Sequence, residues 1–333
     1  MPKSRGRKPK KPAPSRRARG DPSRMAVSRL AAARYRDAKN LLGGLLASER
    51  VPGEALVPIL LPTLWVLKSA ERGDPANACV DACLTLHYGY GQLGIRADLQ
   101  FVDLVVQDSA GHTLMHGNPQ PSWDGTQLDG HCILWLPGCR RFVDPTVAQY
   151  PAVARLALGP IVGRVEAVTG PQGAVAAITQ GQSVPPGVHF GVPRKDAMLL
   201  YTVAEEDAAR AAHSNPFFAR YAPEHRRTGT NLAAYALEAL RTPSAIQRAR
   251  TAPYPRVAAL LDAIGDSPST TDADGNWFFD LPDPDGGIQR LGLDDIPVPQ
   301  GTPPALTWGW PGSTARQVQA RPAGEGSQSG QVP

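Results

Sequence analysis

Three short stretches of the chain constrain its fold most, because together they place a thiol, an imidazole and a carboxylate on a helix and two neighbouring strands. The first surrounds Cys79, the second opens on Gly130-His131 and the third ends in Asp144-Pro145-Thr146. A thiol becomes a useful nucleophile when a base or a helix N-terminus assists it, and the base must itself be held by a third group. The order therefore predicts a cysteine–histidine–aspartate site.

The segment around Cys79 is expected to begin a helix. Asn77 can cap it, which would place Cys79 in the first turn. An alternative start, with Asp74 as the cap, would put the thiol deeper in the helix and activate it less. Both starts stay open.

The spacing of the second and third stretches predicts a hairpin. With a four-residue loop at 136–139, Trp135 would oppose Arg140, and His131 would oppose Asp144. Directly opposed residues share one face, with Cβ atoms about 5 Å apart. A loop with an odd number of residues would put the imidazole and the carboxylate on opposite faces.

The charge of the chain lies mostly in its first residues. Residues 1–24 hold ten Lys and Arg against Asp21 alone, which leaves 25 basic and 29 acidic residues for the rest. This segment has almost nothing to bury, and we expect it to be a disordered basic tail. It could bind nucleic acid or another anionic surface without sequence specificity, or serve as a solubilising or targeting patch.

Composition argues for a cytoplasmic protein without a membrane span. The best apolar run, from Ala55 to Leu67, is short and holds Pro58 and Pro62, and no apolar segment directly follows the basic start. Four cysteines do not form a disulfide framework, and their spacing fits no common zinc motif. We expect neither a metal nor a cofactor, and we interpret residues 272–276 as a hairpin turn and not as a calcium loop.

The remaining pattern predicts a core at 25–203, a helical region at 204–265 and a loop-rich segment at 266–333 that ends in a disordered tail. Whether residues 205–333 form a separate domain is left open, as is the oligomeric state. The expected helices and strands, including a buried strand at Leu99–Val106, follow from hydrophobic periodicity. The helices are expected at Val27–Leu46, Pro58–Ser69, Ala204–His213, Asn231–Leu240 and Arg256–Ile264, and further strands at Pro160–Val168, Gly173–Ile178 and Ala197–Val203.

Over roughly residues 75–150 the chain resembles the transglutaminase-like cysteine enzymes of the papain-like class. That family has a Gly-Ile pair about one helix length after its cysteine, and Gly94-Ile95 stands 15 residues after Cys79. An apolar strand follows, then a strand that opens on histidine and one that ends in Asp-Pro-Thr, which match His131 and residues 144–146. Cys83 departs from the family, which has alanine there.

The resemblance implies an α+β fold, with a catalytic helix packed on an antiparallel sheet and helical additions at both ends. It implies that Cys79 is the nucleophile, that His131 is the general base and that Asp144 orients the imidazole. Asn77 and Trp65 are the candidates to support an oxyanion hole. The expected reaction is acyl transfer, or hydrolysis of an amide or peptide bond, through a thioester on a peptide or protein substrate. The pKa of the thiol is expected to fall.

Two other functions stay open. An arylamine N-acetyltransferase uses a similar order of residues, but that family has Arg-Gly-Gly before its cysteine where this chain has Asp74-Pro75-Ala76. A non-catalytic protein could instead keep the fold and dock on nucleic acid through residues 1–24.

Overall fold

The computed structural model describes residues 22–72, 78–149, 159–164, 168–169, 184, 186–194, 197–283 and 285–306. Nearly all of the expected basic tail lies outside these residues. So do the expected strand at Gly173–Ile178, Asn77 and the end of the expected C-terminal tail. The fold is α+β, with helices beside antiparallel sheets.

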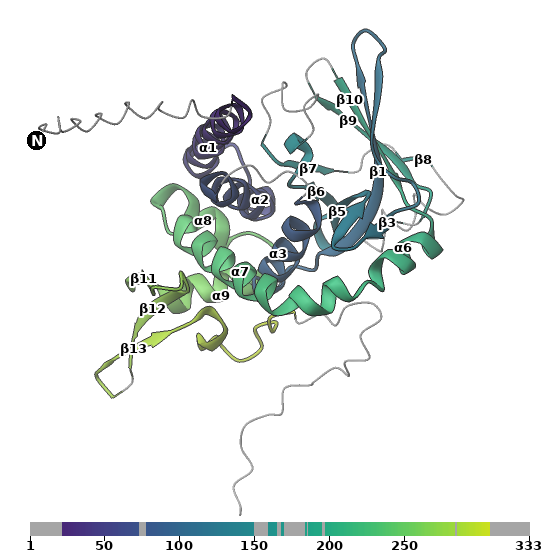
Figure 1. Ribbon diagram of the computed structural model, residues 1–333. Coiled ribbons are helices and arrows are strands. Elements are labelled where there is room, and N and C mark those ends of the chain that lie inside the picture. Colours follow the sequence, from purple (N-terminus) through teal and green to yellow (C-terminus); the bar gives the residue numbers. More distant parts are fainter. Residues whose placement is uncertain are drawn as a thin grey trace, which may run out of the picture.

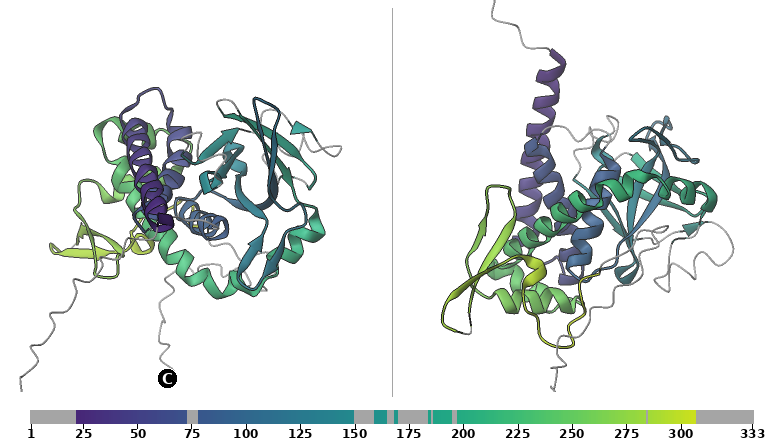
Figure 2. Two further views of the ribbon diagram at one scale, coloured as in Figure 1. Left: turned by 45° about the horizontal axis from the view of Figure 1, so that its top comes forward. Right: turned by 60° about the horizontal axis from the view of Figure 1, so that its bottom comes forward.

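Helix α3 lies between a group of helices and the main sheet, and α6 runs along the far end of that sheet (Figures 1 and 2). The helices are α1 (Pro22–Ala47), α2 (Gly53–Arg72), α3 (Cys79–Gln92), α6 (Glu206–His213), α7 (Pro216–Leu240), α8 (Pro243–Arg250) and α9 (Pro255–Ile264). Each expected helix is confirmed, most with longer bounds.

The two prolines inside α2 help to fix α3. Pro62 has no N–H, so it cannot donate to the carbonyl of Pro58 four residues earlier. The buried hydroxyl of Tyr90, on α3, donates to that carbonyl at 2.6 Å instead. The prolines thus leave α2 helical and create an acceptor that holds α3 against it.

Two glycines bring α3 and α7 close together. A Cβ atom at Gly229 would stand 2.5 Å from the carbonyl oxygen of Thr85 and 2.8 Å from the amide nitrogen of Gly89. One turn earlier on α7, His225 reaches Thr85 through Nδ1 at 3.2 Å and Asp81 through Nε2 at 3.2 Å. The first half of α3 is therefore fixed by α7 as well as by the sheet.

The main sheet has eight strands in the order β7-β6-β5-β1-β10-β9-β8, and β2 also pairs with β1. The paired neighbours whose registers are known are all antiparallel. Its strands are β1 (Asp98–Asp108), β2 (Thr113–Gly117), β5 (His131–Leu136), β6 (Arg141–Asp144), β7 (Ile161–Arg164), β8 (Val168–Thr169), β9 (His189–Arg194) and β10 (Ala197–Val203).

Strands β2 and β5 follow one another along the same side of β1. Gly117 is paired with Asp103, and His131 is paired with Val102, so one line of pairing is broken between Gly117 and His131. The intervening residues leave the sheet and form the hairpin of β3 (Ser122–Asp124) and β4 (Gln127–Asp129). Gly117 (φ +105°) and Gly130 (φ +156°) flank this excursion in conformations that favour glycine. His131 therefore stands where the excursion returns to the sheet.

The hairpin of β5 and β6 has the expected loop length in a shifted register. Leu136 pairs with Arg141 and Leu134 with Val143, so the loop is 137–140 and not 136–139. It contains the 3₁₀ turn η1 (Pro137–Cys139) and ends on Arg140 in the left-handed conformation, with φ +51°. The prediction that His131 lies directly opposite Asp144 is wrong, because the 3₁₀ turn moves the loop by one residue. The loop remains even, so both residues stay on one face and are diagonal neighbours.

One apolar cluster runs from Leu45 to Ile296 and packs α3 between the sheet and helices α2, α7, α8 and α9. A second covers the other face of the main sheet. The expected helical region is thus part of the core that surrounds α3. The C-terminal segment adds η3 (Leu293–Asp295) and a separate sheet of β11 (Ser269–Thr271), β12 (Trp277–Pro282) and β13 (Ile288–Leu291), and the expected turn at 272–276 joins β11 to β12.

Helix α2 contains an apolar window that is longer than the sequence suggested. Gly53–Ala70 has the length and composition of a membrane span, but 61% of it is buried inside the fold. Such burial is typical of a core helix, and the packing of α2 against α1 and α3 accounts for its apolar residues.

Candidate functional site

The three residues singled out in the sequence meet at one place. Cys79 is the first residue of α3, His131 the first of β5 and Asp144 the last of β6. Cys79 is 5% exposed, and the other two side chains are fully buried. The described contacts of His131 include Asp144 on one side and the Cys79 thiol on the other. The structure thus brings these three groups together.

Cys79 occupies the position that the sequence predicted, in the first turn of its helix. The capping residue is Ala78, which makes no side-chain capping hydrogen bond, and Asp81 lies in the same turn. The partial positive charge of the helix N-terminus favours an anion there. Asn77, expected as the cap and as an oxyanion candidate, lies outside the described residues.

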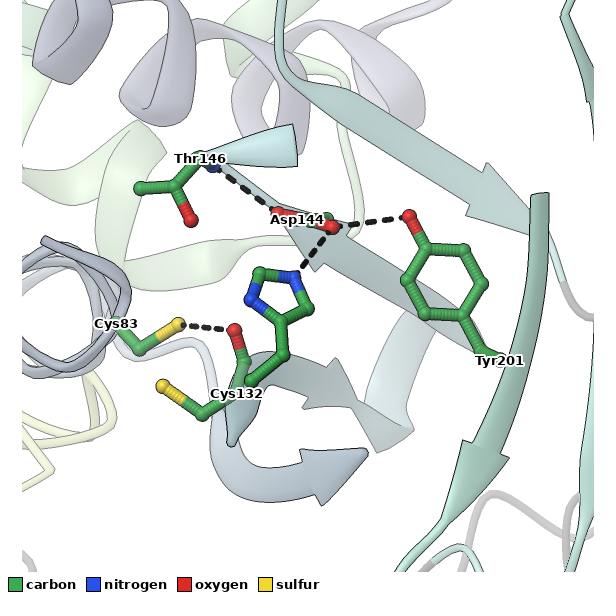
Figure 3. A network of polar contacts seen from close by, with 6 residues as sticks. Cys83, Cys132, Asp144, Thr146 and Tyr201 are labelled. Carbon is green, nitrogen blue, oxygen red and sulfur yellow. Dashed lines mark hydrogen bonds and ion pairs between the residues drawn. The ribbon is translucent and has the colours of Figure 1, made fainter. Parts of the chain in front are cut away.

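The carboxylate of Asp144 is satisfied on both oxygens. Oδ2 lies 2.8 Å from Nε2 of His131 and accepts a hydrogen bond of 2.9 Å from the hydroxyl of Tyr201. Oδ1 accepts a hydrogen bond of 3.1 Å from the backbone N–H of Thr146. Figure 3 shows Asp144 between Tyr201 and Thr146. A buried carboxylate with this set of donors is held in one orientation.

Tyr201 is the contributor that the sequence did not reveal. It lies on β10, in an apolar strand that was expected for packing alone, and it is fully buried. In a flat sheet, with strands about 4.8 Å apart, β10 and β6 would stand roughly 14 Å apart. The Tyr201–Asp144 bond therefore requires a curved sheet, and no local pattern predicts that curvature.

Charge and hydrogen bonding set the protonation of His131. Burial alone would lower its pKa, but the Asp144 carboxylate, together with the contact to Cys79, outweighs burial and raises the pKa to about 10. The imidazole is therefore an imidazolium in the resting site at neutral pH, paired with Asp144.

The pKa of the Cys79 thiol moves opposite to expectation. A hydrogen bond between the Cys79 and Cys132 side chains, followed by burial, raises the pKa well above its ordinary value, whereas His131 acts to lower it. The expectation of a lowered pKa is wrong for this arrangement, because the neighbouring thiol holds the proton on Cys79. The resting pair is thus a thiol beside an imidazolium, and it must lose one proton before the sulfur can attack.

Cys132 and Cys83 make up the rest of the thiol cluster. Cys132 is on the face of β5 opposite to His131. This face packs on α3, which brings Cys132 to Cys79. The Cys83 thiol donates to the backbone carbonyl of Cys132 at 3.4 Å (Figure 3). Burial raises the pKa of both thiols. Within the described part of the chain, no group of three or more ligands is arranged to hold a metal ion.

Two further residues belong to the surroundings of the site. Trp65 lies on α2, partly buried against the larger apolar cluster, and its role at an oxyanion hole stays a prediction. His116, on β2, has its pKa lowered by burial and by the charge of His131. No sequence pattern singles out His116, because the excursion separates it from His131 along the chain.

Comparison of the chain with protein-family models, with curated proteins and with solved structures gives no match. The resemblance over residues 75–150 therefore rests on the residues and motifs of the sequence alone.

Proposed function

We propose that this protein is a cysteine-dependent acyl-transfer enzyme of the transglutaminase-like kind, with a papain-like core in which α3 packs on the main sheet. One observation supports this most. Three residues from three separate elements form a chain of interactions, in which Cys79 interacts electrostatically with His131, His131 bonds to Asp144, and the carboxylate end is buried and fully hydrogen-bonded. Such a chain is the requirement for nucleophilic catalysis by a thiol.

In the proposed reaction, Cys79 attacks the carbonyl carbon of an amide or peptide bond after its proton has left. His131 donates a proton to the departing nitrogen, and the acyl group remains on sulfur as a thioester. Water or an amine then attacks the thioester with His131 as the general base. Asp144 holds the imidazole in the required tautomer, and Tyr201 and Thr146 hold Asp144. The backbone N–H of Cys79 would stabilise the oxyanion, a contribution of about 3 kcal/mol for each such donor.

The raised pKa of the thiol gives this proposal a definite pH dependence. The competent form has one proton fewer than the resting thiol–imidazolium pair. The acylation rate is therefore expected to rise with pH into the alkaline range, where an ordinary cysteine protease would already be fully active.

Acylation of the protein by p-nitrophenyl acetate, followed by peptide mapping, tests the proposal. We expect a burst of p-nitrophenolate, acetyl-Cys79 as the product, and a loss of about 100-fold or more in the His131→Ala variant. His112→Ala is the matched control, because His112 is an exposed histidine bonded to Asp108 on the β1–β2 turn. Acetylation of the partly buried Cys139 in preference to Cys79, or an equal rate in His131→Ala, would contradict the proposal.

The acyl acceptor separates the remaining possibilities. Turnover in buffer alone indicates a hydrolase, and faster turnover with a primary alkyl amine indicates a transglutaminase-like transferase. Faster turnover with an arylamine favours the N-acetyltransferase alternative. A chain that is not acylated at Cys79 but binds nucleic acid in a salt-sensitive way, through residues 1–24, would be the non-catalytic protein.

A further inference from the structure

Asp103 is a buried acid that the proposed reaction does not use. It lies in the middle of β1 and is only 9% exposed, and its Oδ1 atom is buried without a hydrogen-bond partner. Nor does any ion pair of the described residues involve it. A buried acceptor without a donor destabilises the fold, and the effect is larger when the acceptor is charged. A buried carboxylate oxygen without a hydrogen-bond partner is rare in folded proteins, so its presence in Asp103 needs an explanation.

The position of Asp103 on β1 places it on the face that carries α3. Side chains alternate along a strand, so Asp103 shares a face with Phe101. Phe101 is paired with Cys132, and both belong to the apolar cluster that contains Cys79. Asp103 is thus about 7 Å further along the strand than the row that holds Cys132.

The direction of α3 places Asp103 beyond the N-terminal end of that helix. Late in α3, Nδ1 of His87 lies 2.7 Å from the carbonyl oxygen of Ala97, just before β1 begins. At the start of α3, Cys79 interacts with Cys132, which pairs with Phe101, the fourth residue of β1. The helix therefore runs from the Asp103 side of the sheet towards the start of β1, and Asp103 lies ahead of the Cys79 end.

Gly117 lies next to both Asp103 and His131. It is the cross-strand partner of Asp103, and a Cβ atom there would stand 3.3 Å from Cβ and 3.4 Å from the backbone nitrogen of His131. A side chain at this position would therefore crowd the first residue of β5. Asp103 and His131 are thus both neighbours of one residue that has no side chain.

We propose that Asp103 is the specificity-determining residue of the candidate site, and that its Oδ1 accepts a hydrogen bond from a positively charged or N–H-bearing group of the substrate. The chemical class is an ammonium, a guanidinium or an amide N–H next to the acyl group that Cys79 attacks. Such a donor supplies the missing hydrogen bond and is attracted by the carboxylate charge. This inference rests on the proposed role of Cys79.

Charge-matched thiol reagents test the role of Asp103 without a known substrate. The probes are 2-(trimethylammonium)ethyl methanethiosulfonate, a cation, and 2-sulfonatoethyl methanethiosulfonate, an anion. Each forms a mixed disulfide with the thiolate of Cys79 and releases methanesulfinate. The rates are measured in the full chain carrying Cys139→Ser, since Cys139 is the more exposed thiol.

We expect the rate ratio of cation to anion to fall about 5-fold or more in Asp103→Asn, because removing a nearby charge affects the two probes in opposite directions. Asp103→Glu keeps the charge, and its ratio should stay within about twofold of the parent. Asp108→Asn, on the same strand but exposed, is the matched control and should leave the ratio unchanged. Asp103→Ser provides a second neutral variant if the asparagine variant does not fold.

An unchanged ratio in the folded neutral variants overturns the proposal for Asp103. This outcome is distinct from a failure of the proposed function. If the proposed function fails, the labelling rate of Cys79 will be independent of His131, whatever residue stands at position 103.

Discussion

The two faces of the main sheet differ in whether their buried polar groups have hydrogen-bond partners within the fold. The face away from α3 is rich in aromatic rings, and Phe190 and Tyr201 stack with their centroids 5.2 Å apart. On that face Asp144 has all its hydrogen bonds within the fold. The face that packs on α3 carries Cys132 and Asp103, which lacks a partner on Oδ1, and α3 brings the thiols of Cys79 and Cys83 against this face.

The two faces of the sheet therefore have different roles in the proposed site. The aromatic face fixes the carboxylate and, through it, the imidazole, and nothing there needs to move. The α3 face keeps the sulfur protonated through Cys132 and leaves an acceptor for an incoming group. His131 connects the two faces, because it is the first residue of β5, at the point where the chain returns to the sheet after the β3–β4 hairpin. Substitutions on the two faces should therefore have effects of opposite sign on the reactivity of Cys79.

The largest effect is expected from Asp144→Asn. Asparagine has nearly the same shape but removes the charge that raises the pKa of His131, and it can favour the wrong tautomer. The acylation rate of Cys79 should fall about 100- to 10,000-fold. Stopped-flow measurement of the p-nitrophenolate burst checks this. A loss of less than about tenfold would show that the aromatic face does not control the imidazole.

The same variant should change how stability depends on pH. The folded pKa of His131 is raised to about 10, above an unfolded value of about 6.5. Its contribution to the free energy of unfolding is fully present below about pH 6.5 and is lost as the pH rises towards 10. Urea denaturation at pH 6 and pH 7.5 should show this decline in the wild type and not in Asp144→Asn. At pH 7.5 the unfolded thiols, with a pKa of about 8.5, are still mostly protonated and add little to the comparison.

Much of this division follows from the sequence. The even loop between β5 and β6 was enough to place His131 and Asp144 on one face, although the 3₁₀ turn at Pro137–Cys139 shifted the pairing. A shift of the whole loop by one residue keeps the loop length even, so the two residues stay on one face, but it changes which residues are directly paired. The strand at Ala197–Val203 and the helix around Cys79 were also correct, because hydrophobic periodicity and turn residues are local signals.

A smaller loss is expected from Tyr201→Phe, which removes one donor to Asp144 and keeps the ring that stacks on Phe190. A hydrogen bond to a charged group contributes about 1.5–3 kcal/mol, so the acylation rate should fall about tenfold. A packing role alone would leave both the rate and its pH profile unchanged, and the full pH profile of the burst tests this. Tyr90→Phe is the control, because its hydroxyl is also buried but bonds to the Pro58 carbonyl on α2.

The parts that the sequence did not reveal depend on the curvature of the sheet and on the packing between layers. Tyr201 reaches Asp144 across 57 residues of chain. Alternation along β5 points Cys132 away from the imidazole, but the face that Cys132 occupies is the one that packs on α3 and Cys79. Alternation along a strand tells which residues share a face, but not which helix covers that face. The direction of the pKa shift of Cys79 depends on the contact between α3 and the Cys132 face of β5, which the sequence does not reveal.

Cys132→Ala should have the smallest effect, and it should act in the opposite direction. Removing the neighbouring thiol takes away the largest cause of the raised pKa of Cys79, so the thiolate forms at lower pH. A weak hydrogen bond contributes about 0.5–1 kcal/mol, so the iodoacetamide labelling rate of Cys79 at pH 7 should rise about threefold. The pH profile should move towards neutral values. Cys83→Ala is the control, because the Cys83 thiol donates to a backbone carbonyl, and its loss leaves the Cys79–Cys132 contact in place. A slower reaction in Cys132→Ala, with the control unchanged, would mean that Cys132 helps to activate the sulfur, and the contrast between the two faces would not hold.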